Sequence, residues 1–336
     1  MKPLKIVLAP DSFKGTLTSV EVSSAMKNGI KNICSDAIVI SIPMADGGEG
    51  TLDAIISSVN GKIIECKVKN PLGENINSRY GIIEDKKIAV IEMAVASGLN
   101  LIPQKLQNPF NTTTFGTGQL VRNALDNGYR NFIISIGGSA TSDGGAGMAQ
   151  ALGVDFFDEN EKLITKPMTG NLIGKCYDIS TNNLHPAIKE SKFTIASDVK
   201  NPLLGKNGAV NIYASQKGAS KKDLPILENN MSHFYKLIKT KLNRDVKNIS
   251  GAGASGGLGA GLLVFLNAKI QSGIEIVLDI VKFNEKIKNA DYIITGEGKF
   301  DKQTLNGKTI SGILKLAEKN NVSVIAIAGI VDDEKE

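Results

Sequence analysis

The chain has 336 residues, of which 42% are hydrophobic and 22% charged, with 35 glycines and 10 prolines. These proportions are typical of a globular protein and exclude a disordered, low-complexity or fibrous chain. The net charge of +5 comes from scattered lysines, without the basic and aromatic clusters of a nucleic-acid binder, so we expect no nucleic-acid partner and, at this length, two domains.

One local plan recurs five times: a short run of aliphatic and β-branched residues, followed by a turn that contains an acid and usually glycine. Each run has the length and composition of a buried strand. The runs are residues 5–10, 37–43, 131–136, 192–196 and 291–295. The turns that follow them are residues 11–15, 45–50, 137–145, 197–202 and 296–301.

Helices are predicted after several of these turns. Thr18-Ser19-Val20-Glu21 has the form of a capping box, and apolar residues then recur at helical spacing. The same spacing follows Gly116-Thr117-Gly118, and Gly128 is the predicted stop. Alternating strands and helices predict an α/β, Rossmann-like fold with a largely parallel, helix-covered sheet. In such a sheet the loops at the carboxyl ends of the strands form the ligand site, so we expect the turns to converge.

Residues 62–93 break this plan and read as antiparallel hairpins, with a turn at Asn70-Pro71-Leu72-Gly73. We interpret them as the start of a second domain inserted into the first. Residues from 291 onward, with another strand at 322–328, return to the first domain. The sequence therefore predicts a discontinuous Rossmann-like domain of residues 1–62 plus 286–336. It also predicts an inserted, mixed α/β domain of residues 63–285.

The stretch Gly251–Gly256 matches the dinucleotide fingerprint G-x-G-x-x-G. That fingerprint requires a strand directly before it, whereas residues 242–250 are polar and charged. A glycine-rich helix start or a phosphate loop is therefore favoured. A nicotinamide-dependent oxidoreductase that uses this loop stays as the alternative from another class.

Two further catalytic motifs fail when they are checked. Gly253–Gly257 has the G-x-S-x-G form of a hydrolase elbow, but both histidines, His185 and His233, precede the serine, and in that fold the histidine follows it. Gly307-Lys308-Thr309 ends like a Walker loop, but its first glycine would fall at Lys302. We expect structural roles for both histidines.

What remains is a set of turns that carry glycines, carboxylates, hydroxyls and lysines. Backbone N–H groups of successive glycines bind phosphate oxygens, and Mg²⁺ takes carboxylate, phosphate and water oxygens. Phosphoryl transfer needs neither histidine, cysteine nor an organic cofactor. A single acid such as Asp46 or Asp143 before two glycines could be only a turn former. Five such turns together favour phosphate and magnesium chemistry.

The three cysteines are far apart and form no C-x-x-C pair, so neither a disulfide framework nor a zinc site is predicted. The apolar run at the N-terminus is too short for a signal peptide, and no stretch approaches the roughly 18 apolar residues of a membrane span. We expect a cytoplasmic protein without a membrane partner.

Several of these segments closely resemble the bacterial glycerate kinase family of the first type, the glycerate 2-kinases. The resemblance is carried by residues 6–15 (IVLAPDSFKG), 45–51 (ADGGEGT), 137–147 (GGSATSDGGAG), 197–205 (SDVKNPLLG), 251–261 (GAGASGGLGAG) and 295–301 (TGEGKFD). The order of motifs is kept from residue 5 to about 330. Where family members usually read Pro-Gln-Lys-Gly-Ala, this chain has Ser215-Gln216-Lys217-Gly218-Ala219. Family chains also usually continue past Ala328-Gly329.

The resemblance implies phosphorylation of D-glycerate by ATP with Mg²⁺, most simply at the 2-hydroxyl, to give 2-phosphoglycerate and ADP. Phosphorylation at the 3-hydroxyl, or of a related small hydroxy acid, is the alternative. Because none of the five turns contains arginine, Lys14 is the leading candidate to bind the glycerate carboxylate as a point charge. For the base that accepts the hydroxyl proton we favour Asp198 over Asp46.

The candidate residues divide by role, although Asp11, Asp143 and Asp301 fit several roles nearly as well. The catalytic candidates are Asp198, Asp46 and Lys14. The substrate-binding candidates are Asp11, Ser12, Lys14, Lys200 and Asn201. The candidates for the ATP phosphates are Gly137, Gly138, Ser139, Thr141, Asp143, Gly144, Gly145, Gly253, Ser255, Gly256 and Gly257. The metal-binding candidates are Asp46, Glu49 and Glu297.

Overall fold

The computed structural model describes residues 2–300 and 308–332. The chain divides into two compact units, one of Met1–Lys62 with Gln271–Glu336 and one of Ile63–Ile270. Residues 271–285 thus belong to the first unit, whereas the sequence placed them in the inserted domain. The reason is packing: α9 (Gly273–Ile280) lies against α12 (Lys308–Lys319), where Gly312 faces Ile274 and Leu278.

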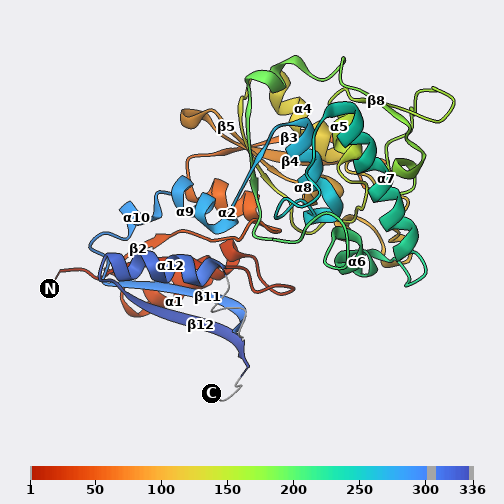
Figure 1. The fold of residues 1–336 in the computed structure, drawn as a ribbon. Coiled ribbons are helices and arrows are strands. Elements are labelled where there is room, and N and C mark those ends of the chain that lie inside the picture. The colour runs from red at the N-terminus through yellow and green to blue at the C-terminus, as the bar shows by residue number, and fades with distance from the viewer. Residues whose placement is uncertain (1, 301–307, 333–336) are drawn as a thin grey trace. The chain divides into compact units, whose positions relative to one another are not determined.

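The first unit contains a parallel sheet in the order β12-β11-β1-β2. Its strands are β1 (Lys5–Pro10), β2 (Ile38–Ser41), β11 (Tyr292–Phe300) and β12 (Ser323–Val331). β1 is an inner strand of this sheet, and its residues Val7, Leu8 and Ala9, which alternate between the two faces, are completely buried. Figure 1 shows α12 beside β11 and β12.

The helices of the first unit are α1 (Ser19–Ile33), α2 (Thr51–Ser58), α9, α10 (Phe283–Lys286) and α12. The capping box predicted for α1 is confirmed. The Thr18 hydroxyl accepts from the Glu21 N–H at 3.2 Å, and the Glu21 carboxylate accepts from the Thr18 N–H at 2.8 Å.

The strand β11 is longer than predicted. The sequence predicts a turn at residues 296–301, but β11 continues to Phe300, so Gly296, Glu297 and Gly298 lie within a strand. A Cβ on Gly296 would lie 2.3 Å from the carbonyl oxygen of Ile327. This glycine therefore permits close approach of two strands, a use of glycine that a sequence does not distinguish from a turn. Asp301 lies outside the described residues.

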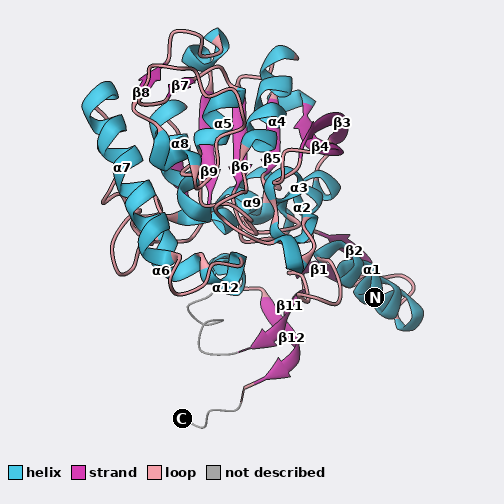
Figure 2. Cartoon of the chain, turned by 90° about the vertical axis from the view of Figure 1, so that its right-hand side faces the viewer, coloured by secondary structure: helices cyan, strands magenta, loops and turns pink. Residues whose placement is uncertain are grey.

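The second unit contains a six-stranded mixed sheet in the order β10-β9-β6-β5-β4-β3. Its strands are β3 (Lys62–Lys69), β4 (Asn75–Ile83), β5 (Ile88–Glu92), β6 (Asn131–Ser135), β9 (Lys192–Ala196) and β10 (Lys269–Gln271). The strands β5, β6 and β9 are parallel, and β4 runs antiparallel to β5. Figure 2 shows β9, β6 and β5 side by side. A separate antiparallel pair joins β7 (Asp155–Phe157) to β8 (Asp178–Ser180).

The helices of the second unit are α3 (Ala94–Ser97), α4 (Phe115–Asp126), α5 (Ala146–Ala151), α6 (Ala209–Tyr213), α7 (Leu224–Leu242) and α8 (Leu258–Phe265). Short 3-10 helices η1 to η7 lie at Glu84–Lys86, Leu99–Leu101, Gln104–Leu106, Leu172–Lys175, Pro186–Glu190, Ser215–Lys217 and Ala254–Gly257. The helix α4 begins earlier than predicted and includes Gly116 and Gly118. A Cβ on Gly118 would lie 2.3 Å from the Met148 carbonyl oxygen, so Gly118 allows α4 to approach α5 closely, whereas a Cβ on Gly116 would lie 1.9 Å from the Lys69 carbonyl oxygen at the end of β3.

The apolar side chains of the second unit are gathered into two buried clusters. In one of them, the Phe156 ring lies 5.8 Å from the Phe234 ring and 6.3 Å from the Phe265 ring, centroid to centroid. None of the helices in the described part of the chain is long and apolar enough to cross a membrane. The predicted α/β fold class, with mainly parallel sheets, is confirmed.

Candidate functional site

In the first unit, the end of β1 places Asp11 among polar groups from three other segments. Its N–H donates to the carbonyl oxygen of Gly296 in β11 at 2.8 Å. One carboxylate oxygen accepts from the Ser12 N–H at 2.6 Å, and the other accepts from the Thr309 hydroxyl in α12 at 2.7 Å. We call Asp11, Ser12, Lys14, Asp46 and Thr309 the Asp11 cluster.

The charge state of Asp11 depends on its surroundings. Burial raises its pKa to about 6, and the negative charge of Asp46 raises it as well. The hydrogen bonds from Thr309 and Ser12 and the positive charge of Lys14 act in the opposite direction. Asp11 and Asp46 are therefore close enough to repel each other, and a cation near them would relieve that repulsion.

The turn after β2 orients Asp46 toward its own glycines. The Asp46 carboxylate accepts from the Gly48 N–H at 3.0 Å, and Gly47 and Gly50 have positive φ values of 91° and 84°. The predicted turn is confirmed, and it leads directly into α2. Glu49 is exposed at the tip of the turn.

Glu297 lies on β11, one residue beyond Gly296, which pairs with Pro10 of β1. Its Oε1 atom is buried and has no hydrogen-bond partner among the described residues. A buried carboxylate oxygen in this condition is costly unless a cation or a donor reaches it. Within residues 2–300 and 308–332, no three carboxylate, thiol or imidazole groups come together as a ready cage for a metal. Asp46, Glu49 and Glu297 therefore do not form such a cage by themselves.

Lys14 lies at the tip of a short hairpin after Asp11. The Phe13 N–H donates to the Leu17 carbonyl at 2.9 Å, and Gly15 has a φ of 79° that suits glycine at this tight turn. The Lys14 side chain is exposed, so its ammonium is accessible to an anion from solution.

In the second unit, the two glycine-rich loops that the sequence singled out lie against each other. The Gly144 N–H donates to the Gly256 carbonyl at 3.1 Å. A Cβ on Gly256 would lie 1.9 Å from the Thr141 carbonyl oxygen, and one on Gly257 would lie 2.9 Å from the Gly144 Cα. We call residues 137–147 and 251–257 the paired glycine loops. Much of their glycine is required because the two backbones touch.

The buried carboxylate of Asp143 organises the first of these loops. It accepts from the Thr114 N–H and hydroxyl, both at 2.8 Å, and from the N–H groups of Gly145 at 3.1 Å and Gly147 at 3.2 Å. Burial raises its pKa, and these four hydrogen bonds act against that rise. Asp143 is completely buried and bound to the chain itself, which favours the turn-former interpretation of this residue over contact with phosphate.

Only a few residues of the paired glycine loops are accessible to solvent. Gly138 is exposed, Gly137 is half-buried, and Ser139 and Thr141 are buried. Ser255 is half-buried and has φ 55° and ψ 45°, followed by left-handed Gly256 and Gly257 directly before α8. A left-handed serine is uncommon, and such conformations gather at ligand sites.

The turn after β9 carries Asp198, Lys200 and Asn201, and it contacts the second glycine loop. The Gly253 N–H donates to the Asn201 carbonyl at 3.0 Å. The Asn201 side-chain amide is already engaged, since it donates to the Asn207 carbonyl at 2.9 Å and accepts from the Tyr213 hydroxyl at 2.7 Å. Asn201 thus fastens the turn, while Asp198 is half-buried and Lys200 exposed.

Two residues of these clusters were not among the predicted site residues. Thr309 belongs to the Gly307-Lys308-Thr309 motif that failed as a Walker loop, and it binds Asp11. Lys217 is buried and donates to the Ser139 hydroxyl and the Thr141 carbonyl, both at 2.7 Å. Both residues lie in segments that stood out in the sequence, Gly307-Lys308-Thr309 and Ser215–Ala219. Their roles were missed because Thr309 binds a residue 298 positions away and Lys217 binds one 78 positions away.

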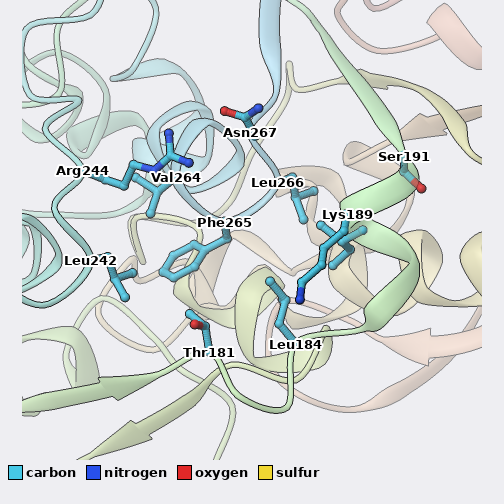
Figure 3. A pocket seen from close by; sticks show the side chains of 11 residues that line it. Thr181, Leu184, Lys189, Ser191, Leu242, Arg244, Val264, Phe265, Leu266 and Asn267 are labelled. Carbon is cyan, nitrogen blue, oxygen red and sulfur yellow. The ribbon is translucent and has the colours of Figure 1, made fainter.

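A cavity of about 430 Å³ lies in another part of the second unit (Figure 3). It is lined by Lys189, which precedes β9, and by Phe265, Leu266 and Asn267 at the C-terminal end of α8. The paired loops lie at the N-terminal end of α8 instead. The cavity is therefore at the opposite end of that helix, away from the strand ends where ligands of open α/β sheets bind.

The two histidines have the structural roles expected of them. The Nε2 atom of His185 lies 3.0 Å from the Asp126 carboxylate, and that of His233 lies 2.7 Å from the Cys176 carbonyl oxygen. Residues 243–250, all of which the structure describes, contain no strand, so the context that a nicotinamide fingerprint requires before Gly251 is missing.

The chain is similar in sequence and in structure to known proteins. The sequence profile of the Glycerate kinase family matches residues 6–336. The chain is 47% identical to a glycerate kinase from Halalkalibacterium halodurans, over 96% of this chain and 85% of that one. It is 46% identical to a glycerate 2-kinase from Escherichia coli, over 98% of this chain and 86% of that one. A crystal structure assigned as glycerate kinase 2 of Salmonella typhimurium LT2 superposes with a TM-score of 0.89 at 40% identity, over 98% of this chain and 90% of that one.

These relatives identify the chain as a small-molecule kinase. It belongs to the glycerate kinase family. The oxidoreductase alternative finds no support, either in these relatives or in the local structure before Gly251.

Proposed function

We propose that this kinase transfers the γ-phosphoryl group of ATP to the 2-hydroxyl of D-glycerate and releases 2-phosphoglycerate and ADP. The observation that carries the proposal is the 46% identity, over 98% of the chain, to a protein named glycerate 2-kinase. Transfer to the 3-hydroxyl, or to a related small hydroxy acid, is the alternative. The substrates are soluble metabolites, in keeping with the predicted cytoplasmic location.

The transfer requires a base for the hydroxyl proton. The hydroxyl oxygen attacks the γ-phosphorus, the bond from that phosphorus to the β,γ-bridging oxygen breaks, and the proton leaves the attacking oxygen. We assign the proton to Asp198, which follows the carboxyl end of β9 in a turn fastened by Asn201. Asp46 is the second candidate.

For the phosphates of ATP we propose the paired glycine loops. The run of left-handed residues from Ser255 to Gly257 turns successive backbone N–H groups at the start of α8, and such arrangements bind phosphate oxygens. The exposed Gly138 and the half-buried Ser255 are the accessible members. Asp143, Gly144 and Gly145 support the loops from inside.

For glycerate and magnesium we propose the residues of the first unit. The exposed ammonium of Lys14 would bind the glycerate carboxylate, with Ser12 as a further donor. Lys200, which is also exposed, is the alternative candidate for this role. Magnesium prefers oxygen ligands and often takes only one or two carboxylates, so Glu297, whose Oε1 is buried without a hydrogen-bond partner among the described residues, would be the first ligand, and Asp46 and Glu49 are the candidates for a second. When bound, the ion would neutralise charge on the transferring phosphoryl group.

A coupled assay tests the proposal. The protein is mixed with ATP, Mg²⁺ and D-glycerate, and enolase, pyruvate kinase and lactate dehydrogenase report the product. Enolase consumes only the 2-phospho product, so a signal without phosphoglycerate mutase supports transfer to the 2-hydroxyl. A signal that appears only after the mutase is added shows transfer to the 3-hydroxyl. Absence of ADP with D-glycerate would contradict the proposed function.

A further inference from the structure

We propose that Lys217 is a positioning residue for the ATP phosphates, because its ammonium group holds residues 139 and 141 in the conformation that binds them. This inference rests on the proposed role of the paired glycine loops in binding ATP. It assigns a task to a residue that belongs to none of the glycine motifs.

Three residues in succession are fixed at this point of the loop. The Lys217 ammonium donates to the Ser139 hydroxyl and to the Thr141 carbonyl, both at 2.7 Å. Between them, the Ala140 N–H donates to the Ser97 carbonyl at 3.0 Å, and the Ala140 carbonyl accepts from the Thr112 hydroxyl at 2.9 Å. Without Lys217, the Ser139 hydroxyl and the Thr141 carbonyl would lose these partners, while the backbone before them would keep its bond from the Leu99 N–H to the Gly138 carbonyl at 2.8 Å.

Lys217 itself has little freedom to move. It ends η6, and Gly218 follows it with a φ of 99°; a Cβ there would lie 2.0 Å from the Gln107 carbonyl oxygen. The Ala219 N–H then donates back to the Ala214 carbonyl at 3.1 Å. The side chain therefore extends from a rigid turn, and only 2% of its surface is exposed.

Burying the ammonium group of Lys217 has a cost, and packing alone does not explain why a lysine occupies this position. Burial lowers its pKa to about 7, and the negative charge of Asp143 acts in the opposite direction. The Asp143 carboxylate accepts four hydrogen bonds from other groups of the chain. Its negative charge also favours the protonated form of Lys217. A methionine would fill the same space without this desolvation. A cation here lies within hydrogen-bond distance of the loop that is proposed to receive an anion.

The experiment compares Lys217→Met with Lys221→Met, an exposed lysine four residues further along the chain. We expect Lys217→Met to raise the KM for ATP about tenfold, with the KM for D-glycerate unchanged and kcat lowered less than the KM is raised. Lys221→Met should match the wild type. If Lys217 were only structural, the variant would contain fewer active molecules, so kcat would fall while the KM for ATP stayed the same.

Hydrogen exchange provides a second measurement that does not depend on glycerate. We expect ATP with Mg²⁺ to protect residues 137–147 of the wild type, and Lys217→Met to lose that protection while β5 and β6 keep theirs. If Lys217→Met does not fold, Ser139→Ala removes one of the two acceptors without removing the charge, and it should show the same changes to a smaller extent.

The outcomes separate the two proposals. A wild type that yields no ADP with glycerate but shows ATP protection of residues 137–147 contradicts the proposed substrate, and the exchange data still decide the role of Lys217. A folded variant with unchanged KM for ATP and unchanged protection overturns the inference. So does a wild type whose loop ATP does not protect.

Discussion

The hydroxyl of Thr309 donates to the carboxylate of Asp11 at 2.7 Å, although the two residues are 298 positions apart. This bond connects the start of α12 to the end of β1. It favours the ionised form of a carboxylate that burial and Asp46 drive toward the neutral form. Asp11 is therefore a residue whose charge the fold maintains against its local environment.

Asp11→Asn should make the protein more stable at neutral pH. The substitution removes the repulsion with Asp46, and the Thr309 hydroxyl can reverse to accept from the new amide. After allowance for solvent screening, we expect a gain of about 1 kcal/mol, seen as a rise in Tm of roughly 2 °C. If Asp11 contacts the substrate, the kcat/KM for D-glycerate should fall in the same variant.

The pH dependence of this gain follows from the sign of the shift. Asp11 ionises near its ordinary pKa of 3.8 when unfolded and near 6 when folded, so its contribution to stability falls as pH rises through that window. The Tm difference between Asp11→Asn and the wild type should be small below the unfolded pKa of 3.8, grow between there and pH 6, and reach its full value above pH 6. A difference that is constant across this range would contradict the raised pKa of Asp11.

Asp198→Asn should lower kcat by about 10²- to 10⁴-fold, because the amide cannot accept the hydroxyl proton. The KM for ATP should change little, and the circular dichroism spectrum should match the wild type. Asp36→Asn, at an exposed position after α1, is the matched control and should leave kcat unchanged. Turnover of Asp198→Asn close to that of the wild type would transfer the role of base to Asp46.

Glu297→Gln should raise the Mg²⁺ concentration for half-maximal activity by about tenfold, since a neutral amide is a poorer ligand for a hard cation. Without magnesium, the same variant should be at least as stable as the wild type, because it no longer buries an unpartnered carboxylate oxygen. Glu318→Gln on the exposed face of α12 serves as the control. An unchanged magnesium titration would remove Glu297 from the proposed metal ligands.

Gly256→Ala should lower the free energy of unfolding by about 3 kcal/mol or more, through a left-handed backbone and overpacking together. Its φ is 64°, and the new Cβ would lie 1.9 Å from the Thr141 carbonyl oxygen. Gly128→Ala, with a φ of 84° and nothing within 4 Å, isolates the backbone effect and should cost about 1 kcal/mol. Equal losses in urea denaturation would show that the paired loops are not in close contact.

The strands and the main helices could be predicted because their buried positions are apolar and recur with the period of a strand or a helix. The aliphatic run of β1 and the capping box of α1 are local signals, and both are confirmed. Glycines were harder to interpret. Gly118 was expected just before a helix and Gly296 in a turn. They instead allow close packing inside a helix and a strand, and the atoms that require a missing Cβ lie far away in the sequence.

The candidate site shows the same division. Asp11, Asp46 and the first of the paired glycine loops were recognisable because each directly follows a predicted strand. The second loop, residues 251–257, was recognisable only by its run of glycines. Lys217 and Thr309 could not be assigned in this way, because their importance lies in what they touch. Asp143 was a candidate for phosphate contact, and only the four hydrogen bonds inside the loop indicate that it supports the turn from within.

The pairing of β1 with β11 also has a consequence for synthesis of the protein. Ile6 pairs with Tyr292, so the N-terminal strand leaves the ribosome long before one of its two neighbours exists. At typical rates of translation the interval is about 10 to 60 s, and the intervening second unit has time to fold first. During that interval Val7, Leu8 and Ala9, which are fully buried at the end, are exposed to solvent and to wrong partners. The order of synthesis thus makes the N-terminal strand a segment that needs protection in the cell until β11 is made.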